Sequence, residues 1–175
     1  MKTKSILITL LFFLSFSFII GQPKSNSDKK PSQSLQVSIY DLGSEKYGNL
    51  SLDDILNTYK GKVIYLDFWA SWCGPCKREM PYSQKLKKEL NGKDVAFVYI
   101  STDNNTDKWE AAIDQLQING IHYRANPKVR NQIIQRFNLQ YIPRYVLIDK
   151  SGKVVDENAN RPSNPQTKQD IEKLL

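Results

Sequence analysis

The two cysteines of the chain, Cys73 and Cys76, stand two residues apart, directly after an apolar run. That run, residues 63–68, is apolar on both faces apart from one acid, which is typical of a central strand in a covered sheet. Gly74 and Pro75 between the cysteines suit the first turn of a helix. A cysteine pair at such a strand-to-helix junction predicts an α/β sheet and thiols that cycle between dithiol and disulfide.

The helix expected to begin near Cys73 explains why this thiol would react. Unpaired backbone N–H groups and the positive end of the helix dipole favour a thiolate there, and the thiolate is the reactive form. Cys73 is therefore the expected nucleophile, which attacks a substrate disulfide and forms a mixed disulfide. Cys76, one turn further and more covered, then attacks Cys73 and releases the reduced substrate.

Three other roles for the cysteine pair compete with redox chemistry. A structural disulfide across so short a loop removes little unfolded-state entropy and stabilises little. A zinc site needs four ligands, but there is no third cysteine, and the single histidine, His122, is distant in sequence and expected at the surface. Buried, inert cysteines do not fit the Gly-Pro between them. We therefore expect a redox pair, with no metal and no cofactor.

The N-terminal residues have the pattern of an export signal. Lys2 and Lys4 precede an apolar run at residues 6–20, which is shorter than the roughly 20 apolar residues of a full membrane span. Residues 1–21 are predicted to be a signal peptide or an uncleaved N-terminal anchor in the inner membrane. Residues 22–34 are polar and are predicted to be a disordered linker. The folded domain, residues 35–175, is then expected in the periplasm or cell envelope.

The charge of the chain argues against nucleic acid as a partner. The formal net charge is +7, but residues 1–34 hold five basic residues and one acidic residue, which leaves +3 for residues 35–175. That charge is weak and mixed with Asp and Glu. Contact with a membrane is expected only through the N-terminal segment.

Strand and helix signals alternate through residues 35–175. Apolar alternation and buried runs predict strands, and capped stripes at helical spacing predict helices. Strands are expected at residues 35–40, 63–68, 95–101, 121–123, 144–149 and 154–156, and helices at residues 52–59, 73–90, 106–116, 127–137 and 166–175. The helix at 127–137 is expected to bury Val129, Ile133, Ile134 and Phe137. This order predicts an α/β fold, a central mixed β-sheet flanked by helices on both faces.

Residues 67–76, Asp-Phe-Trp-Ala-Ser-Trp-Cys-Gly-Pro-Cys, resemble the active-site strand and motif of thioredoxin-fold proteins. Pro81 matches the family's helix-kinking proline, and Ile142-Pro143 matches its cis-proline site. An extra strand and helix within residues 106–137 resemble the insertion of the exported TlpA/ResA-like thiol-disulfide oxidoreductases. The resemblance covers residues 35–175 and implies a thioredoxin fold with a βα insertion.

Asp67 is the candidate base behind the cysteines. It shares a strand face with Val63 and Tyr65 by alternation, and it resembles the buried thioredoxin aspartate. There it would accept the proton of Cys76, directly or through water. Cytosolic thioredoxins place a lysine on the neighbouring strand, whereas here an aromatic, Phe97, is expected. Burial without a cation should raise the pKa of this acid; the alternative is an acid satisfied by hydrogen bonds alone.

Glu79 and Pro143 are further candidates. Glu79 lies three residues after Cys76 on the same helix face. The resemblance places a glutamate near the site, and the alternative is a solvated residue that favours the helix start. The Ile142–Pro143 bond should be cis and should present the backbone of Ile142 beside Cys73, where an extended substrate peptide can pair.

The remaining candidates concern contact with the substrate. Trp72 is expected to be an exposed flat contact beside the nucleophile, whereas Trp69 is expected to pack inside. Gly74-Pro75 should tune the relative stability of the two sulfurs and resembles the reducing thioredoxins. Tyr141 and Arg144 flank the proline and are candidates for shaping substrate choice.

Together these features predict an exported thiol-disulfide oxidoreductase that reduces disulfides in protein substrates. A reducing dithiol in an oxidising compartment is soon spent, so a membrane-borne electron donor is expected. A thioredoxin-fold peroxidase is one alternative, but residues 70–73 lack the proline that such enzymes carry before a lone cysteine. A non-enzymatic binding or chaperone module is another, and the intact cysteine pair argues against it. Turnover of a generic disulfide separates the three.

Overall fold

The computed structural model describes residues 37–175. The predicted signal or anchor at residues 1–21, the linker at residues 22–34 and the first two residues of the predicted domain lie outside the described residues. From residue 37 onward, no helix has the length and apolar character needed to cross a membrane.

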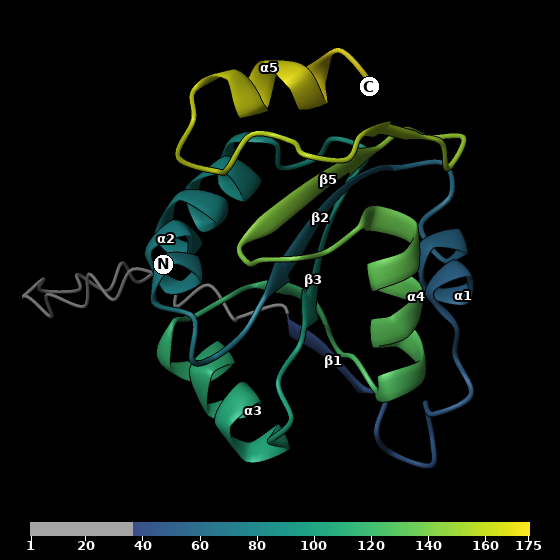
Figure 1. The fold of residues 1–175 in the computed structure, drawn as a ribbon. Helices are drawn as coiled ribbons and strands as arrows, with labels where there is room; N and C mark the ends of the chain where they lie inside the picture. The colour runs from purple at the N-terminus through teal and green to yellow at the C-terminus, as the bar shows by residue number, and fades with distance from the viewer. Residues whose placement is uncertain (1–36) are drawn as a thin grey trace, which may run out of the picture. The chain divides into compact units, whose positions relative to one another are not determined.

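Six strands of the described domain form one mixed sheet in the order β1-β4-β3-β2-β5-β6 (Figure 1). The first four in that order run parallel to one another, and β5 pairs antiparallel with both β2 and β6. The strands are β1 (Val37–Asp41), β2 (Val63–Trp69), β3 (Val95–Ser101), β4 (Gly120–Arg124), β5 (Arg144–Ile148) and β6 (Val154–Asp156). Every residue of β2 is buried, which explains its nearly continuous apolar sequence.

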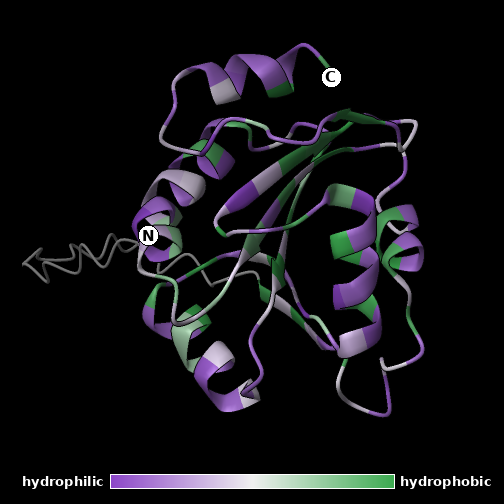
Figure 2. Cartoon of the chain, viewed as in Figure 1, coloured by the Kyte–Doolittle hydropathy of each residue, from purple (hydrophilic) through white to green (hydrophobic). Residues whose placement is uncertain are grey.

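Helices cover both faces of the sheet, as predicted (Figure 1). Side chains of α2, α3 and α5 join one apolar cluster with the sheet, and those of α1 and α4 join the other. The helices are α1 (Leu52–Asn57), α2 (Gly74–Glu89), α3 (Thr106–Gln115), α4 (Pro127–Phe137) and α5 (Gln166–Glu172). Figure 2 shows hydrophobic residues concentrated on the strands and polar residues on the outer sides of the helices. The inserted α3 and β4 place β4 between β1 and β3.

Two expectations about burial are wrong. Ile134 is 46% exposed, because α4 contacts the sheet through Val129, Ile133 and Phe137, a stripe spaced by four residues. Ile134 is rotated about 100° out of that stripe. His122 is fully buried instead of lying at the surface, because β4 is an inner strand with neighbours on both sides.

Candidate active site

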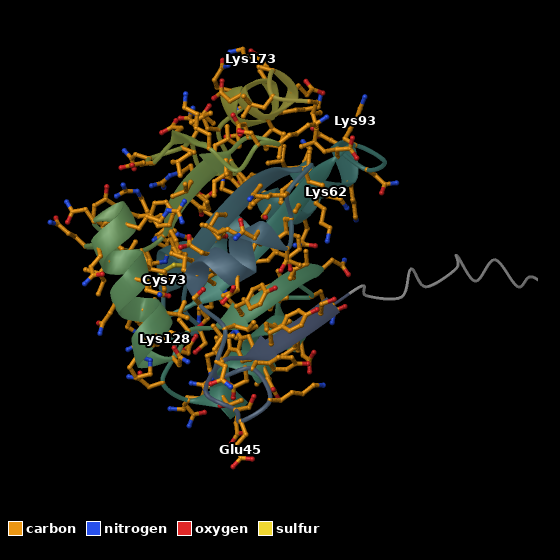
Figure 3. All side chains as sticks on the ribbon, turned by 90° about the vertical axis from the view of Figure 1, so that its right-hand side faces the viewer. Glu45, Lys62, Cys73, Lys93, Lys128 and Lys173 are labelled. Carbon is orange, nitrogen blue, oxygen red and sulfur yellow. A yellow bond between two sulfur atoms is a disulfide. The ribbon has the colours of Figure 1, made fainter. Side chains whose placement is uncertain are left out.

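The cysteine pair lies where β2 leads into α2. Cys73 is the N-cap of α2, and the Cys73–Cys76 disulfide has a Cα–Cα distance of 5.3 Å. The backbone N–H of Cys76 donates to Cys73 Sγ at 3.2 Å. This amide belongs to the first helical turn, where backbone N–H groups have no partner within the helix. In the view of Figure 3, Cys73 is labelled within the outline of the domain, whereas Lys173 and Glu45 lie at its top and bottom. Cys73 is 4% exposed and Cys76 is 0% exposed, which makes Cys73 the more accessible of the two residues.

A buried acid that the sequence analysis missed holds the loop before Cys73. Asp103, just beyond β3, accepts hydrogen bonds from Ser71 N at 2.8 Å and from Ser71 Oγ at 2.7 Å. Ser101 Oγ donates to the same carboxylate at 2.6 Å. Because β2 and β3 are parallel neighbours, their C-terminal ends lie at the same edge of the sheet. The position of an acid just after β3 is the sequence signal that could have identified Asp103.

Asp67 is buried on β2, and its raised pKa is confirmed. Within the described domain neither carboxylate oxygen has a hydrogen-bond partner, so the alternative of an acid satisfied by hydrogen bonds is wrong. Burial raises the pKa of Asp67 well above its usual value, and the negative charge of Glu79 adds to this. The aromatic opposite Asp67 on β3 is Tyr99, not Phe97, and Tyr145 lies opposite on β5.

The tyrosines around Asp67 supply no positive charge. Burial raises the pKa of the Tyr65, Tyr99 and Tyr145 hydroxyls above the ordinary value, so all three are neutral near pH 7. A buried carboxyl among neutral groups keeps its full desolvation penalty. Asp67 therefore holds its proton to a higher pH than an exposed aspartate does.

Glu79 is buried, not solvated, so the solvated alternative is wrong. Its side chain accepts hydrogen bonds from Ser163 N and Ser163 Oγ, both at 3.0 Å. Arg161 Nη1 lies 3.8 Å from Glu79 Oε1. These contacts join α2 to the loop at residues 157–165, and Glu79 and Ser163 are 84 positions apart in sequence. The residues around Ser163 gave no pattern from which this contact could be predicted.

The Ile142–Pro143 peptide bond is cis, as predicted. Ile142 packs against the apolar cluster that contains both cysteines. Arg144, the first residue of β5, pairs with Phe68 of β2, so the cis-proline lies at the sheet edge from which the cysteine loop leaves.

The two tryptophans near the cysteines differ in exposure, as predicted. Trp72 is 68% exposed, and Trp69 is buried. An exposed aromatic next to Cys73 offers a flat apolar contact to a substrate, whereas Trp69 belongs to the core.

His122 is part of the core beneath the site. Its ring stacks on Tyr99 with centroids 4.7 Å apart, and its Nε2 lies 3.1 Å from the Ile118 carbonyl oxygen. Burial lowers the pKa of His122 to about 4. In the part of the chain that the structure describes, no cluster of three or more His, Cys, Asp or Glu residues is placed to hold a metal ion.

Comparison with known proteins assigns this architecture to a family. The family model described as thioredoxin-like matches residues 61–154. The chain belongs to the thioredoxin-like family. Its curated relatives include the thiol-disulfide oxidoreductase ResA of Bacillus thuringiensis subsp. konkukian, which is 30% identical over 120 residues, 69% of this chain and 65% of the relative. The first relatives are thus matched over 65% of their own length.

Two further thioredoxin-like relatives extend the comparison. ResA of Bacillus anthracis is 26% identical over 182 residues and is matched over 100% of this chain and 97% of the relative. A crystal structure from Bacteroides vulgatus, provisionally assigned as a thiol-disulfide oxidoreductase, is 38% identical, with a TM-score of 0.63, over 69% of this chain and 83% of that chain. The predicted fold and the resemblance to ResA-like oxidoreductases are confirmed.

Proposed function

We propose that this protein is an exported thiol-disulfide oxidoreductase that reduces disulfides in other proteins. The observation that carries the proposal is the Cys73–Cys76 disulfide at the N-terminus of α2. Cys73 is the more exposed residue of the pair, and its sulfur accepts an amide hydrogen bond. The relatives named as thiol-disulfide oxidoreductases support the reaction class.

The proposed cycle begins with the reduced pair. The Cys73 thiolate attacks one sulfur of a substrate disulfide, so a Cys73–substrate S–S bond forms and the substrate S–S bond breaks. Asp67 then takes the proton of Cys76, and the new thiolate attacks Cys73 Sγ. The Cys73–Cys76 disulfide forms, the second substrate thiol leaves, and two electrons have passed to the substrate.

Other residues assist binding and proton transfer in this proposal. Trp72, Gly74 and Pro75 contact the substrate beside the nucleophile. The extended backbone of the substrate pairs with the backbone at Ile142 and Pro143. Glu79 raises the pKa of Asp67 through its charge. Asp67 therefore titrates nearer neutral pH, where a general base works best.

The proposed setting is the periplasm or cell envelope. Lys2, Lys4 and the apolar run at residues 6–20 support export, and a membrane-borne donor would restore the dithiol. Gly74-Pro75 supports a potential on the reducing side of roughly −200 mV. Equilibration with glutathione measures that potential, and a value near the roughly −120 mV of a strong oxidant would indicate disulfide formation instead.

Trapping tests the order of the two cysteines. Cys76→Ser should accumulate mixed disulfides through Cys73 in its own cell, whereas the matched Cys73→Ser variant should not. Adducts found by mass spectrometry mainly on Cys76 of the unmodified protein would overturn the assignment. Absence of insulin reduction by the reduced wild type would overturn the reductase function.

A further inference from the structure

A polar cavity of about 620 Å³ lies beside the cis-proline, between the start of β5 and residues 158–165. We propose that this cavity is a substrate subsite that receives an acidic side chain of the peptide being reduced, held by Arg144 and Arg161. The inference rests on the proposed function and adds a substrate class to it.

The charge of the cavity has one sign. Arg144 and Arg161 line it, and no Asp or Glu is among its lining residues. A concave site whose lining holds cations and no carboxylate favours an anionic ligand. The guanidinium group suits a carboxylate in particular, because its planar N–H groups match the two oxygens.

Arg144 is held in place but not neutralised. Its Nε donates to the Glu157 carbonyl oxygen at 2.7 Å, and its guanidinium lies over the Tyr141 ring, 5.7 Å from the centroid. Across residues 37–175 it forms no ion pair with a carboxylate. Its terminal N–H groups are therefore left for a ligand.

Arg161 is engaged only loosely. Its side chain is 59% exposed and lies 3.8 Å from Glu79, whose carboxylate already accepts two hydrogen bonds from Ser163. A long ion pair at an exposed side chain contributes little. If Arg161 turns to a ligand, Glu79 loses this ion pair but keeps both hydrogen bonds from Ser163.

Tyr145 is a lining residue with a polar group that is unpartnered among residues 37–175. It lines the cavity, and its buried hydroxyl has no hydrogen-bond partner within the described domain. A buried unpaired hydroxyl is costly. A polar partner that comes within reach of this hydroxyl would remove that cost.

The position of the cavity favours a peptide as the source of the carboxylate. Pro143 lines it, and the preceding Ile142 packs against the apolar cluster that contains both cysteines. A peptide lying in extended form along Ile142 directs alternate side chains to one face. An acidic residue near the reacting cysteine would then enter the cavity while its disulfide meets Cys73.

The test varies the charge of the substrate, so it does not depend on a variant that folds. Two disulfide-linked peptides differ only in Glu or Gln beside the cysteine, and kcat/KM is measured with the full chain. We expect about a fivefold preference for Glu, equivalent to about 1 kcal/mol, which disappears in 1 M salt. Equal rates for the two peptides, or a preference for Gln, would overturn the subsite.

Variants then locate the preference. Arg144→Gln and Arg161→Gln should each reduce the Glu-to-Gln ratio, and both together should bring it near one. Arg144→Lys should keep part of it. Lys93→Gln removes the same charge from a residue outside the cavity and should leave the ratio unchanged. An unchanged ratio in the folded double variant would contradict the proposal.

Binding separates this inference from the proposed function. The same peptides with serine in place of cysteine are titrated calorimetrically, and the Glu form should bind about fivefold more tightly. Retained Glu preference without any disulfide turnover would refute the oxidoreductase but not the subsite. The rates with oxidised glutathione and with its ester are compared to test a small-molecule source of the carboxylate. A preference for the charged form of glutathione, with no preference between the two peptides, would overturn the peptide assignment.

Discussion

Replacement of His122 should change the pH dependence of stability in a calculable way. The ring is fully buried, stacked on Tyr99 and bonded through Nε2 to the Ile118 carbonyl. Burial lowers the pKa of His122 from 6.5 to about 4; the Ile118 carbonyl opposes this change, and the charge of Lys87 adds to it.

The sign and size follow from proton linkage. The unfolded chain binds a proton on this histidine near pH 6.5 and the folded chain near pH 4, so stability falls as the pH drops through 6.5. At about 1.4 kcal/mol for each tenfold difference in proton affinity, the full penalty is about 3 kcal/mol, reached below pH 4. About 2 kcal/mol of it should appear between pH 7 and pH 5.

Urea unfolding of the oxidised protein at pH 7, 6 and 5 measures this penalty. His122→Phe keeps the ring stack but leaves the Ile118 carbonyl without its partner, at a cost of about 1 kcal/mol at pH 7. At pH 5 the variant should be the more stable protein by about 1 kcal/mol. Subtracting the two curves cancels the other titrations, including that of Asp67. His122→Gln is the second variant, and it should show the same slope.

A flat difference between wild type and variant from pH 7 to pH 5 would refute this reasoning. The chain has one histidine, so its proton NMR titration is unambiguous. An apparent pKa near 6.5 in the folded protein would refute the reasoning independently.

Three other perturbations act on the carboxyls around the cysteines. Asp67→Asn should stabilise the protein at neutral pH, because an acid with a raised pKa destabilises the fold once the pH exceeds its unfolded value; urea unfolding at pH 4 and pH 8 should show the gain only at the higher pH. The same variant should slow release of the mixed disulfide, and unchanged release would contradict the base role. Asp103→Asn should cost about 2 kcal/mol by weakening its bonds to Ser71 and should slow attack by Cys73, measured against a neutral disulfide. Glu79→Gln removes a like charge and should lower the pKa of Asp67, so the pH profile of mixed-disulfide release should move to lower pH.

The elements of the fold could be predicted from the sequence because their signals are local. Ser51 and Asp54 form the capping box at the start of α1, and Asn126 caps α4 ahead of its proline. The apolar run at residues 63–68 predicted β2 for the same reason, since a strand buried on both faces needs no alternation. The cysteine pair at the start of α2 and the exposed Trp72 followed from the motif and its position at a strand end, and the cis-proline followed from the resemblance of Ile142-Pro143 to the family's cis-proline site.

Boundaries and burial were less predictable. α1 and α5 end earlier than predicted, because the last turn of a helix depends on what packs against it. A single polar histidine such as His122 is expected at the surface. It is a core residue because β4 lies inside the sheet, between β1 and β3.

The tertiary structure alone decided which side chains meet at the site. Strand register sets Tyr99, not Phe97, opposite Asp67. The bonds from Ser71 to Asp103 and from Ser163 to Glu79 join residues 32 and 84 positions apart. Caps and hydrophobic periods act over one or two turns of chain, whereas these contacts depend on the order of the strands and on how loops close at one edge of the sheet. The cysteine pair could therefore be recognised from a short stretch of sequence. The side chains that surround it come together only when the sheet is assembled.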